Sequence, residues 1–164
     1  MEMDKNMVEL DEKYMRMAIE KTKEGMKEGQ TPFGACIVKD GEVIACEHNK
    51  VWATTDITAH AEIVAIRAAC KKLNTIDLSG CEIYSTCEPC PMCFSAIHWA
   101  RISTIVYGAS IADAQGGGFN ELTISNHQMK DLGRSKVEII DNFLKDECVE
   151  LFSMWNKMEN KKTY

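Results

Sequence analysis

The chain begins with a stretch of helical periodicity that is followed by two short stretches rich in β-forming residues. Leu10–Glu28 carries apolar or small residues every three or four positions and ends before Gly29, which predicts an amphipathic helix. Phe33–Lys39 and Glu42–Glu47 favour strands, and the Asp40-Gly41 pair between them is typical of a tight hairpin turn. The chain therefore opens with a helix and an antiparallel hairpin.

The rest of the chain alternates helices with strands. Thr58 is placed to cap a helix that runs to about Leu73, and its apolar stripe is Ile63, Ile66, Cys70 and Leu73. Further strands are expected at Cys81–Ser85, Ile102–Tyr107 and Val137–Ile140, and further helices at Pro91–Trp99 and Lys145–Asn160. Strands that alternate with helices predict an α/β layer structure, in which the hairpin requires at least one antiparallel pair.

Length and composition indicate an ordinary globular domain. The 164 residues are 45% hydrophobic and 27% charged, which predicts one domain over residues 1–164 and excludes a disordered chain. No stretch approaches the 18 or so apolar residues of a membrane span. Met1–Glu12 is acidic, unlike a basic signal or transit peptide, so we expect a cytoplasmic protein without a membrane partner.

Charge and cysteine distribution narrow the choice of partner. The net charge of −6 provides no basic footprint for a phosphate backbone, so nucleic acid is disfavoured as a partner. Of the 8 cysteines, three fall between Cys87 and Cys93. Such clustering points to a bound metal rather than to a disulfide framework.

Two short motifs carry the candidate chemistry. His60-Ala61-Glu62 is followed thirty residues later by Pro89-Cys90-Pro91-Met92-Cys93. One imidazole and two thiolates are ligands that zinc prefers, and the combined pattern is the signature of zinc deaminases. Three protein ligands, His60, Cys90 and Cys93, would hold one zinc ion per chain and leave a fourth position for water, from which Glu62 would take a proton.

A closed structural zinc site is the alternative interpretation. Cys87 has the same spacing from Cys90 as Cys90 has from Cys93, and it would complete a four-ligand set. Against this, Cys87 precedes Pro89, where a helix is disfavoured, and a closed site gives Glu62 no role. The other cysteines are expected to be small buried hydrophobic residues: Cys36, Cys46, Cys70, Cys81 and Cys148.

Over nearly its whole length the chain resembles the cytidine deaminase superfamily, and within it the bacterial guanine deaminase branch. The resemblance rests on the two zinc motifs together with Pro32-Phe33-Gly34-Ala35, Trp99-Ala100-Arg101 and the ending Asn160-Lys161-Lys162-Thr163-Tyr164. It implies a three-layer α-β-α sandwich around a mixed five-stranded sheet. It also implies the zinc ligands and the proton-shuttling Glu62 named above, with the backbone N–H of Ala61 or Cys90 steadying the tetrahedral centre.

The resemblance implies a purine pocket as well. Asn49 matches a substrate-binding asparagine, whose carboxamide can both donate to and accept from a purine edge. Trp99 resembles a pocket wall and Phe119 follows a glycine-rich loop where a base can stack, although either fits a core position equally well. The remaining histidines, His48, His98 and His127, have no companion ligands and are interpreted as structural or exposed polar residues.

Glu121 is the candidate for recognising guanine. The base displays N1–H and its 2-amino group side by side, and one carboxylate can accept both hydrogen bonds. The branch has a pair of aspartates here, whereas this chain has Asn120-Glu121, so the acid is one methylene longer. The alternative for Glu121 is a solvated loop charge.

The C-terminal segment is expected to close the pocket. The helix that starts at Lys145 would anchor a tail ending in Tyr164, which brings a ring, a hydroxyl and the terminal carboxylate to one point. The resemblance implies that residues 145–164 exchange between the subunits of a homodimer. An ordinary frayed terminus is the alternative.

These observations favour a zinc hydrolase that converts guanine and water to xanthine and ammonia, by attack of water at C2. A tRNA adenosine deaminase shares the metal motifs, but it must bind an anticodon arm, which the acidic balance disfavours. A cytosine or nucleoside deaminase and a zinc-stabilised binding module remain open, because one scaffold serves many functions.

Overall fold

A computed structural model describes residues 10–164, so most of the acidic N-terminal stretch lies outside the described residues. Its centre is a five-stranded sheet in the order β2-β1-β3-β4-β5. The strands are β1 (Gly34–Lys39), β2 (Glu42–His48), β3 (Cys81–Cys87), β4 (Thr104–Ala109) and β5 (Glu138–Ile140). β1 is antiparallel to β2 and β3, while β3–β4 and β4–β5 are parallel, which confirms the mixed sheet.

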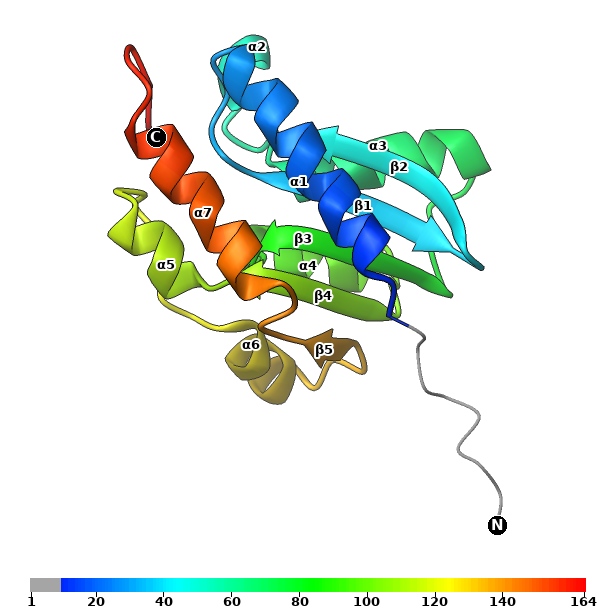
Figure 1. Cartoon of the computed structure of the whole chain (residues 1–164). Helices are drawn as coiled ribbons and strands as arrows, with labels where there is room; N and C mark the ends of the chain where they lie inside the picture. The colour runs from blue at the N-terminus through cyan, green and yellow to red at the C-terminus, as the bar shows by residue number, and fades with distance from the viewer. Residues whose placement is uncertain (1–9) are drawn as a thin grey trace.

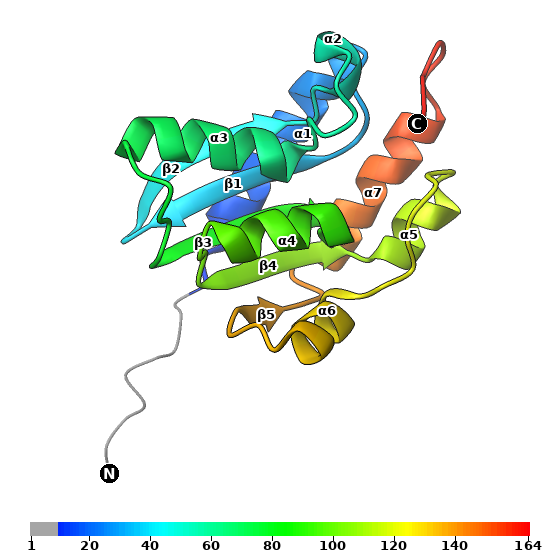
Figure 2. The same ribbon diagram turned by 180° about the vertical axis from the view of Figure 1, so that it is seen from behind.

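Helices cover both faces of this sheet and complete the expected three-layer sandwich. α1 (Glu12–Lys27) and α7 (Lys145–Asn156) lie on one face (Figure 1). α3 (Ala61–Leu73) and α4 (Pro91–Trp99) lie on the other (Figure 2). β3 and β4 occupy the centre of the sheet, and most of their residues are buried because helices cover both sides.

Three short helices were not expected from the sequence: α2 (Val51–Thr54), α5 (Ile111–Gly116) and α6 (Asn126–Gly133). α5 and α6 each begin with a reciprocal capping box, formed by Ser110 with Asp113 and by Ser125 with Gln128. Such short helices depend on their caps and on tertiary contacts, and they are too brief to show a clear hydrophobic period.

The helix expected to begin at Thr58 begins instead at Ala61, with His60 at its N-cap. The Thr58 hydroxyl and N–H both donate to Asp56 Oδ1, at 2.6 and 2.9 Å, so Thr58 belongs to a local turn and not to the helix cap. The side chain at the start of α3 is therefore that of His60 rather than that of a threonine.

The face of α3 that packs on the sheet also differs from the expected stripe. Its completely buried side chains are Ala61, Ala65 and Ala69, whereas the larger residues of the expected stripe are only half-buried: Ile63, Ile66, Cys70 and Leu73. Alanines four residues apart share one face, and their small side chains let the helix backbone lie close to β1 and β2. This close approach places the N-terminus of α3 over the end of the sheet.

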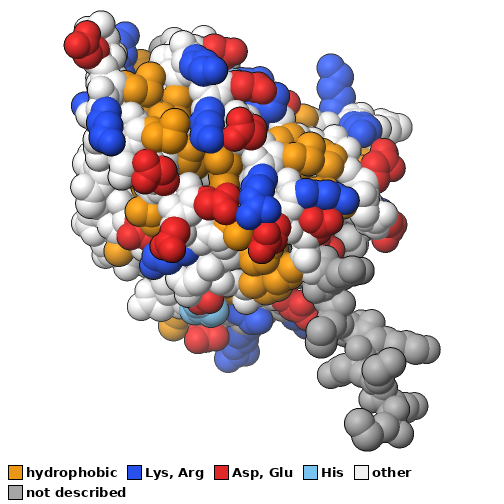
Figure 3. Space-filling view, in the orientation of Figure 1, with side chains coloured by type: hydrophobic (Ala, Val, Ile, Leu, Met, Phe, Trp, Pro, Cys, Tyr) orange, Lys and Arg blue, Asp and Glu red, His pale blue; other side chains and the backbone are white. Residues whose placement is uncertain are grey.

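The surface visible in Figure 3 carries no extended patch of side chains with one sign of charge. On the face formed by α1 and α7, Lys and Arg side chains alternate with Asp and Glu. Several pair directly, as in the Arg16 guanidinium with Glu147 at 3.0 Å. Within residues 10–164, the structure contains no helix with both the length and the hydropathy of a membrane span.

Candidate active site

The two predicted zinc motifs come together at the N-termini of two neighbouring helices. His60 is the N-cap of α3 and Cys90 is the N-cap of α4, with Pro91 as the first residue of α4. Cys93 follows one turn later on α4 and is completely buried. Both helices lie on the same face of the sheet (Figure 2), so their positive N-terminal ends converge on this point.

The donor atoms are arranged as a zinc ion requires. Nδ1 of His60 lies 3.6 Å from Sγ of Cys90 and 3.6 Å from Sγ of Cys93. Zinc bonds of about 2.3 Å to sulfur and about 2.0 Å to nitrogen, at tetrahedral angles, separate the donors by roughly 3.5 Å. All three ligand atoms lie within 4.8 Å of one another, and this is the one such metal-binding group among residues 10–164.

The electrostatics of the cluster also suit a cation. The hydrogen bond with Cys93 is the largest cause that lowers the pKa of Cys90 to about 4, and the contact with His60 adds to it. Burial opposes the charged form of His60, but its hydrogen bond with Cys90 and the charge of Glu62 outweigh burial and raise its pKa. Cys90 therefore favours the thiolate, which is the form of cysteine that binds metal.

Glu62 lies beside these ligands. Its Oε2 accepts a hydrogen bond from the Cys93 thiol at 3.1 Å, and its side chain is 5% exposed. Its Oε1 lies 2.7 Å from Oγ of Ser85, which is also 2.6 Å from the carbonyl oxygen of Cys87. A hydroxyl has one proton to donate, so Ser85 can donate to ionised Glu62 or accept from protonated Glu62 while donating to Cys87.

Cys87 does not join the metal-binding group. Its thiol donates to the carbonyl oxygen of Ser110 at 3.5 Å. Cys87 is not among the three residues whose ligand atoms lie within 4.8 Å of one another. The geometry thus supports three protein ligands rather than the closed four-ligand alternative.

A cleft opens beside the metal-binding group. Its inner part is lined by residues of both motifs and by residues from other segments of the chain. In sequence order these are Phe33, His60, Glu62, Cys87, Glu88, Cys90, Glu121 and Tyr164. Its outer part shares His60, Cys90, Glu121 and Tyr164, and adds Phe119 among others. The structure therefore brings Glu121, Phe119 and Tyr164 to the cleft from distant parts of the sequence.

The C-terminal tail lies in this cleft within the same chain. The Tyr164 hydroxyl accepts hydrogen bonds from Nδ2 of Asn49 at 2.7 Å and from Oγ1 of Thr31 at 3.3 Å. The Tyr164 ring lies 5.6 Å from the His60 ring, tilted by 30°. Further back, Nε1 of Trp52 donates to the carbonyl oxygen of Lys162 at 3.2 Å and fixes the path of the tail.

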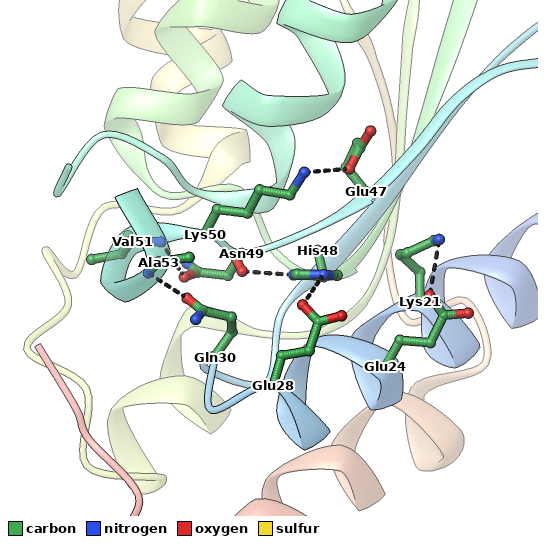
Figure 4. Close-up of polar contacts among 10 residues, drawn as sticks. All are labelled: Lys21, Glu24, Glu28, Gln30, Glu47, His48, Asn49, Lys50, Val51 and Ala53. Atoms are coloured by element: carbon green, nitrogen blue, oxygen red, sulfur yellow. Dashed lines mark hydrogen bonds and ion pairs between the residues drawn. The ribbon is translucent and has the colours of Figure 1, made fainter. Parts of the chain in front are cut away.

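Asn49 is buried and donates to Tyr164, which lines the cleft. Its Oδ1 accepts the N–H of Val51 at 3.0 Å, which orients the carboxamide and directs Nδ2 to Tyr164. His48 secures the same segment: Nδ1 lies 2.7 Å from the Asn49 carbonyl oxygen and Nε2 lies 3.3 Å from Glu28 (Figure 4). The His48 ring packs where a Cβ on Gly25 would stand, so α1 supports Asn49 through His48.

Glu121 and Phe119 reach the cleft from the segment that follows α5. Glu121 is half-buried, and burial is the largest cause that raises its pKa to about 7. Phe119 is only 4% exposed and packs against Phe33 and Trp155, with ring centroids 4.9 and 5.1 Å apart. Phe119 thus combines the two roles considered for it, since it belongs to an aromatic core and also lines the cleft.

Trp99 does not line the cleft of its own chain, contrary to the expectation of a pocket wall. It is the last residue of α4, at the opposite end from Cys90, and it is 81% exposed. The nine-residue helix puts its two ends about 13 Å apart, which is too far for an indole ring to return to the ligands.

Three residues that contact the site are not predicted from the sequence. Ser85 touches Glu62, Thr31 touches Tyr164, and Glu88 accepts the N–H groups of Ile111 and Asn126 at 2.9 Å each. Glu88 thereby joins the metal loop to the starts of α5 and α6. Ser85 and Glu88 could have been suspected from their place beside the cysteine motif, whereas nothing near Thr31 in the sequence indicates its contact with Tyr164.

Comparison with known proteins yields a family match and close relatives. Residues 8–109 match the family described as the cytidine and deoxycytidylate deaminase zinc-binding region. A guanine deaminase of Bacillus subtilis (strain 168) is 40% identical over 154 residues, which cover 93% of this chain and 98% of that protein. A tRNA-specific adenosine deaminase of the same organism is 36% identical over 152 residues, covering 93% and 92%.

Solved structures give the same result for the fold. The guanine deaminase from Nitrosomonas europaea superimposes with a TM-score of 0.84 at 28% identity, over 93% of this chain and 88% of that one. The fold is therefore shared with a solved guanine deaminase, and the sequence is similar to relatives that are named for different substrates.

Proposed function

Because the chain belongs to the cytidine and deoxycytidylate deaminase family and is a zinc-binding deaminase, we propose that its substrate is a free purine base, guanine. The observation that carries this proposal is the position of Glu121, which lines the same cleft as His60 and Cys90. The reaction would convert guanine and water to xanthine and ammonia. The similarity to guanine deaminases supports it.

The catalytic role is proposed for Glu62. A zinc ion in an open three-ligand site supplies a water molecule of lowered pKa. Glu62 takes one proton from the attacking water and transfers it to a ring nitrogen, and then takes the remaining proton of the added hydroxyl and transfers it to the departing amine. The Ser85 hydroxyl suits this cycle, because it can donate to the Glu62 carboxylate or accept from the carboxylic acid at the same 2.7 Å contact. The backbone N–H of Ala61, at the start of α3, is the proposed donor to the tetrahedral centre.

The binding roles are proposed for residues outside the two zinc motifs. The Glu121 carboxylate accepts from N1–H and the 2-amino group of guanine, while Asn49 donates through Nδ2 to an acceptor elsewhere on the purine. Phe119 and Tyr164 provide aromatic contact with the ring. We further propose that Tyr164 enters a partner's cleft when residues 145–164 exchange in a homodimer.

Adenosine in tRNA is the second candidate, because a tRNA-specific adenosine deaminase is nearly as similar as the guanine deaminase. The same contacts argue against it. Adenine has an acceptor at N1, so an ionised carboxylate can accept only from the 6-amino group and not from two adjacent donors as in guanine. The tail that lies across the cleft and the net charge of −6 both oppose entry of an anticodon loop.

The test is a measurement of ammonia released by zinc-loaded protein from guanine, adenine, cytosine, their nucleosides and a tRNA. Guanine alone should yield ammonia at an enzymatic rate, with xanthine as the second product. Ammonia released from the tRNA, with none released from guanine, would instead establish a tRNA adenosine deaminase. A zinc-containing protein inactive on every compound would contradict both and favour a binding module.

A Cys87→Ser variant tests the three-ligand arrangement separately. Zinc content should stay at one ion per chain, because Cys87 hydrogen-bonds to Ser110 and not to the metal-binding group. Loss of zinc from Cys87→Ser, at a level matching loss from Cys90→Ser, would restore the closed structural site.

A further inference from the structure

Cys36 and Cys46 face each other across the first two strands of the sheet. They are directly paired in the antiparallel register of β1 and β2. The next pair on the same face is Gly34 and His48, and both of these residues pack against α1. The two cysteine side chains therefore share the face of the sheet that α1 covers (Figure 1).

This pairing holds the two cysteines at the separation of a disulfide. Directly opposed residues of antiparallel strands have Cα atoms about 4.5 or 5.5 Å apart. Disulfide-bonded cysteines have Cα atoms about 4.4 to 6.8 Å apart. Both thiols are free in the structure and stand at directly opposed positions, so a bond between the sulfurs needs little movement of the backbone.

The two thiols differ in access and in acidity. Cys36 is completely buried, whereas Cys46 is partly exposed on the edge strand β2. The hydrogen bond from Cys36 is the largest cause that lowers the pKa of Cys46, and the Lys21 ammonium adds to it. Glu24 and Glu47 act in the opposite direction, but each is paired with a lysine, Glu24 with Lys21 at 3.0 Å and Glu47 with Lys50 at 3.2 Å (Figure 4).

We propose that Cys36 and Cys46 form a redox-active dithiol, which small disulfides such as oxidised glutathione convert to a reversible cross-strand disulfide. This role is additional to the structural one expected for both residues from the sequence, and it does not depend on the proposed substrate. The geometry also assigns the order of reaction. Cys46 is the attacking residue because the oxidant can reach it, and buried Cys36 is the resolving residue.

The exchange proceeds in two balanced steps. The Cys46 thiolate attacks one sulfur of oxidised glutathione, forms a mixed disulfide and releases one glutathione, which takes up a proton. The Cys36 thiol then loses its proton and attacks the Cys46 sulfur, which releases the second glutathione as a thiol. The protein loses two hydrogen atoms, and one small disulfide becomes two thiols.

The position of the bond gives it a consequence for the site. β1 follows Phe33, which lines the cleft, and β2 leads into Asn49, which donates to the cleft residue Tyr164. A covalent link two residue pairs from Gly34 and His48 fixes the edge strand beside the segment that carries Asn49. Oxidation therefore acts next to the proposed binding residue without touching the zinc ligands.

The experiment uses zinc-loaded full-length protein incubated with oxidised glutathione, followed by peptide mapping under non-reducing conditions. The expected product is a Cys36–Cys46 linked peptide that dithiothreitol converts back, while zinc stays bound. Cys36→Ser should accumulate glutathione on Cys46, because the resolving thiol is missing. Cys46→Ser should leave Cys36 unmodified, because the buried thiol is out of reach of the oxidant.

The melting temperatures of both serine variants are measured first, to establish that both proteins are folded. Absence of the linked peptide from the folded wild-type protein would overturn the proposal. So would glutathione on Cys36 in folded Cys46→Ser, since it would reverse the assigned order. These outcomes do not depend on the ammonia assay. Formation of the linked peptide would therefore support the redox-active dithiol even if the protein proved inactive on guanine.

Discussion

The two sides of the cleft are built in different ways. On the metal side, His60, Glu62, Cys90 and Cys93 come from two short motifs at the N-termini of α3 and α4. On the opposite side, Asn49, Phe119, Glu121 and Tyr164 come from separate loops and the C-terminal tail. The metal side rests on two helices packed on the sheet, whereas the other side depends on contacts between segments far apart in the sequence.

This contrast indicates where chemistry and specificity reside. The metal side lies in the region that matches a deaminase family, and relatives of this chain are named for different substrates, so we assign the deamination step to this side. The other side is free to vary, because loops tolerate substitution better than the helix N-termini that hold a metal. If the division is correct, substitutions on the metal side should abolish turnover, and those on the other side should change which base binds.

Glu62→Gln is expected to have the largest effect. Loss of a general acid and base costs about 10²- to 10⁴-fold in kcat. Zinc content should remain one ion per chain, because Glu62 is not among the three residues of the metal-binding group. Ammonia release and zinc analysis measured on the same sample check both expectations, with His60→Ala as the variant that should lose zinc as well. A wild-type kcat in Glu62→Gln would contradict the assignment of Glu62 as the proton shuttle.

Deletion of Lys161–Tyr164 should have the next largest effect. It removes the Tyr164 hydroxyl that contacts Asn49 and Thr31, and two hydrogen bonds at about 1 kcal/mol each correspond to roughly a 30-fold fall in kcat/KM. Tyr164→Phe keeps the ring and loses the same two hydrogen bonds, so it should show a similar fall if the hydroxyl carries the effect. Steady-state kinetics and a melting temperature decide the matter. Unchanged kcat/KM in the deletion variant would indicate a frayed terminus.

Ser85→Ala tests the support of the metal side and should have a smaller effect. The variant removes the hydroxyl 2.7 Å from Glu62, so we expect kcat to fall by about tenfold and KM to stay constant. Ser95→Ala is a suitable control, because Ser95 lies on α4, is exposed and donates only to the carbonyl oxygen of Pro91. Equal kcat values for the two variants would mean that Ser85 has no part in the proton cycle.

Trp99→Ala should have the smallest effect. The side chain is 81% exposed and lies away from the cleft of its own chain. Exposed substitutions usually change free energies by less than about 0.5 kcal/mol, which is roughly a twofold change in kcat/KM. A large rise in KM for guanine would show that Trp99 completes the cleft of a second subunit.

Much of the fold and nearly all of the metal side could be predicted from the sequence. The five strands, the four longer helices and the residues of the metal-binding group follow from local periodicity and from ligand spacing. The short helices α2, α5 and α6 could not be predicted, because their stability comes from caps and tertiary contacts rather than from an apolar stripe.

The opposite side of the cleft was harder to predict for a related physical reason. The contact of Thr31 with Tyr164 joins residues 133 positions apart, and it exists only because the sheet and α7 bring their segments together. The position of Trp99 has the same origin: the sequence shows that a large ring is present, but the direction of α4 decides on which surface it lies.

The most direct test of this division separates binding from chemistry. Guanine binding is measured by calorimetry on zinc-loaded Glu62→Gln, which does not consume the ligand, and on the double variant Glu62→Gln/Glu121→Gln. A hydrogen bond to a buried carboxylate contributes about 1.5 to 3 kcal/mol, so the double variant should bind guanine roughly ten- to hundredfold more weakly while retaining zinc. Equal dissociation constants for the two proteins would contradict the assignment of guanine recognition to Glu121.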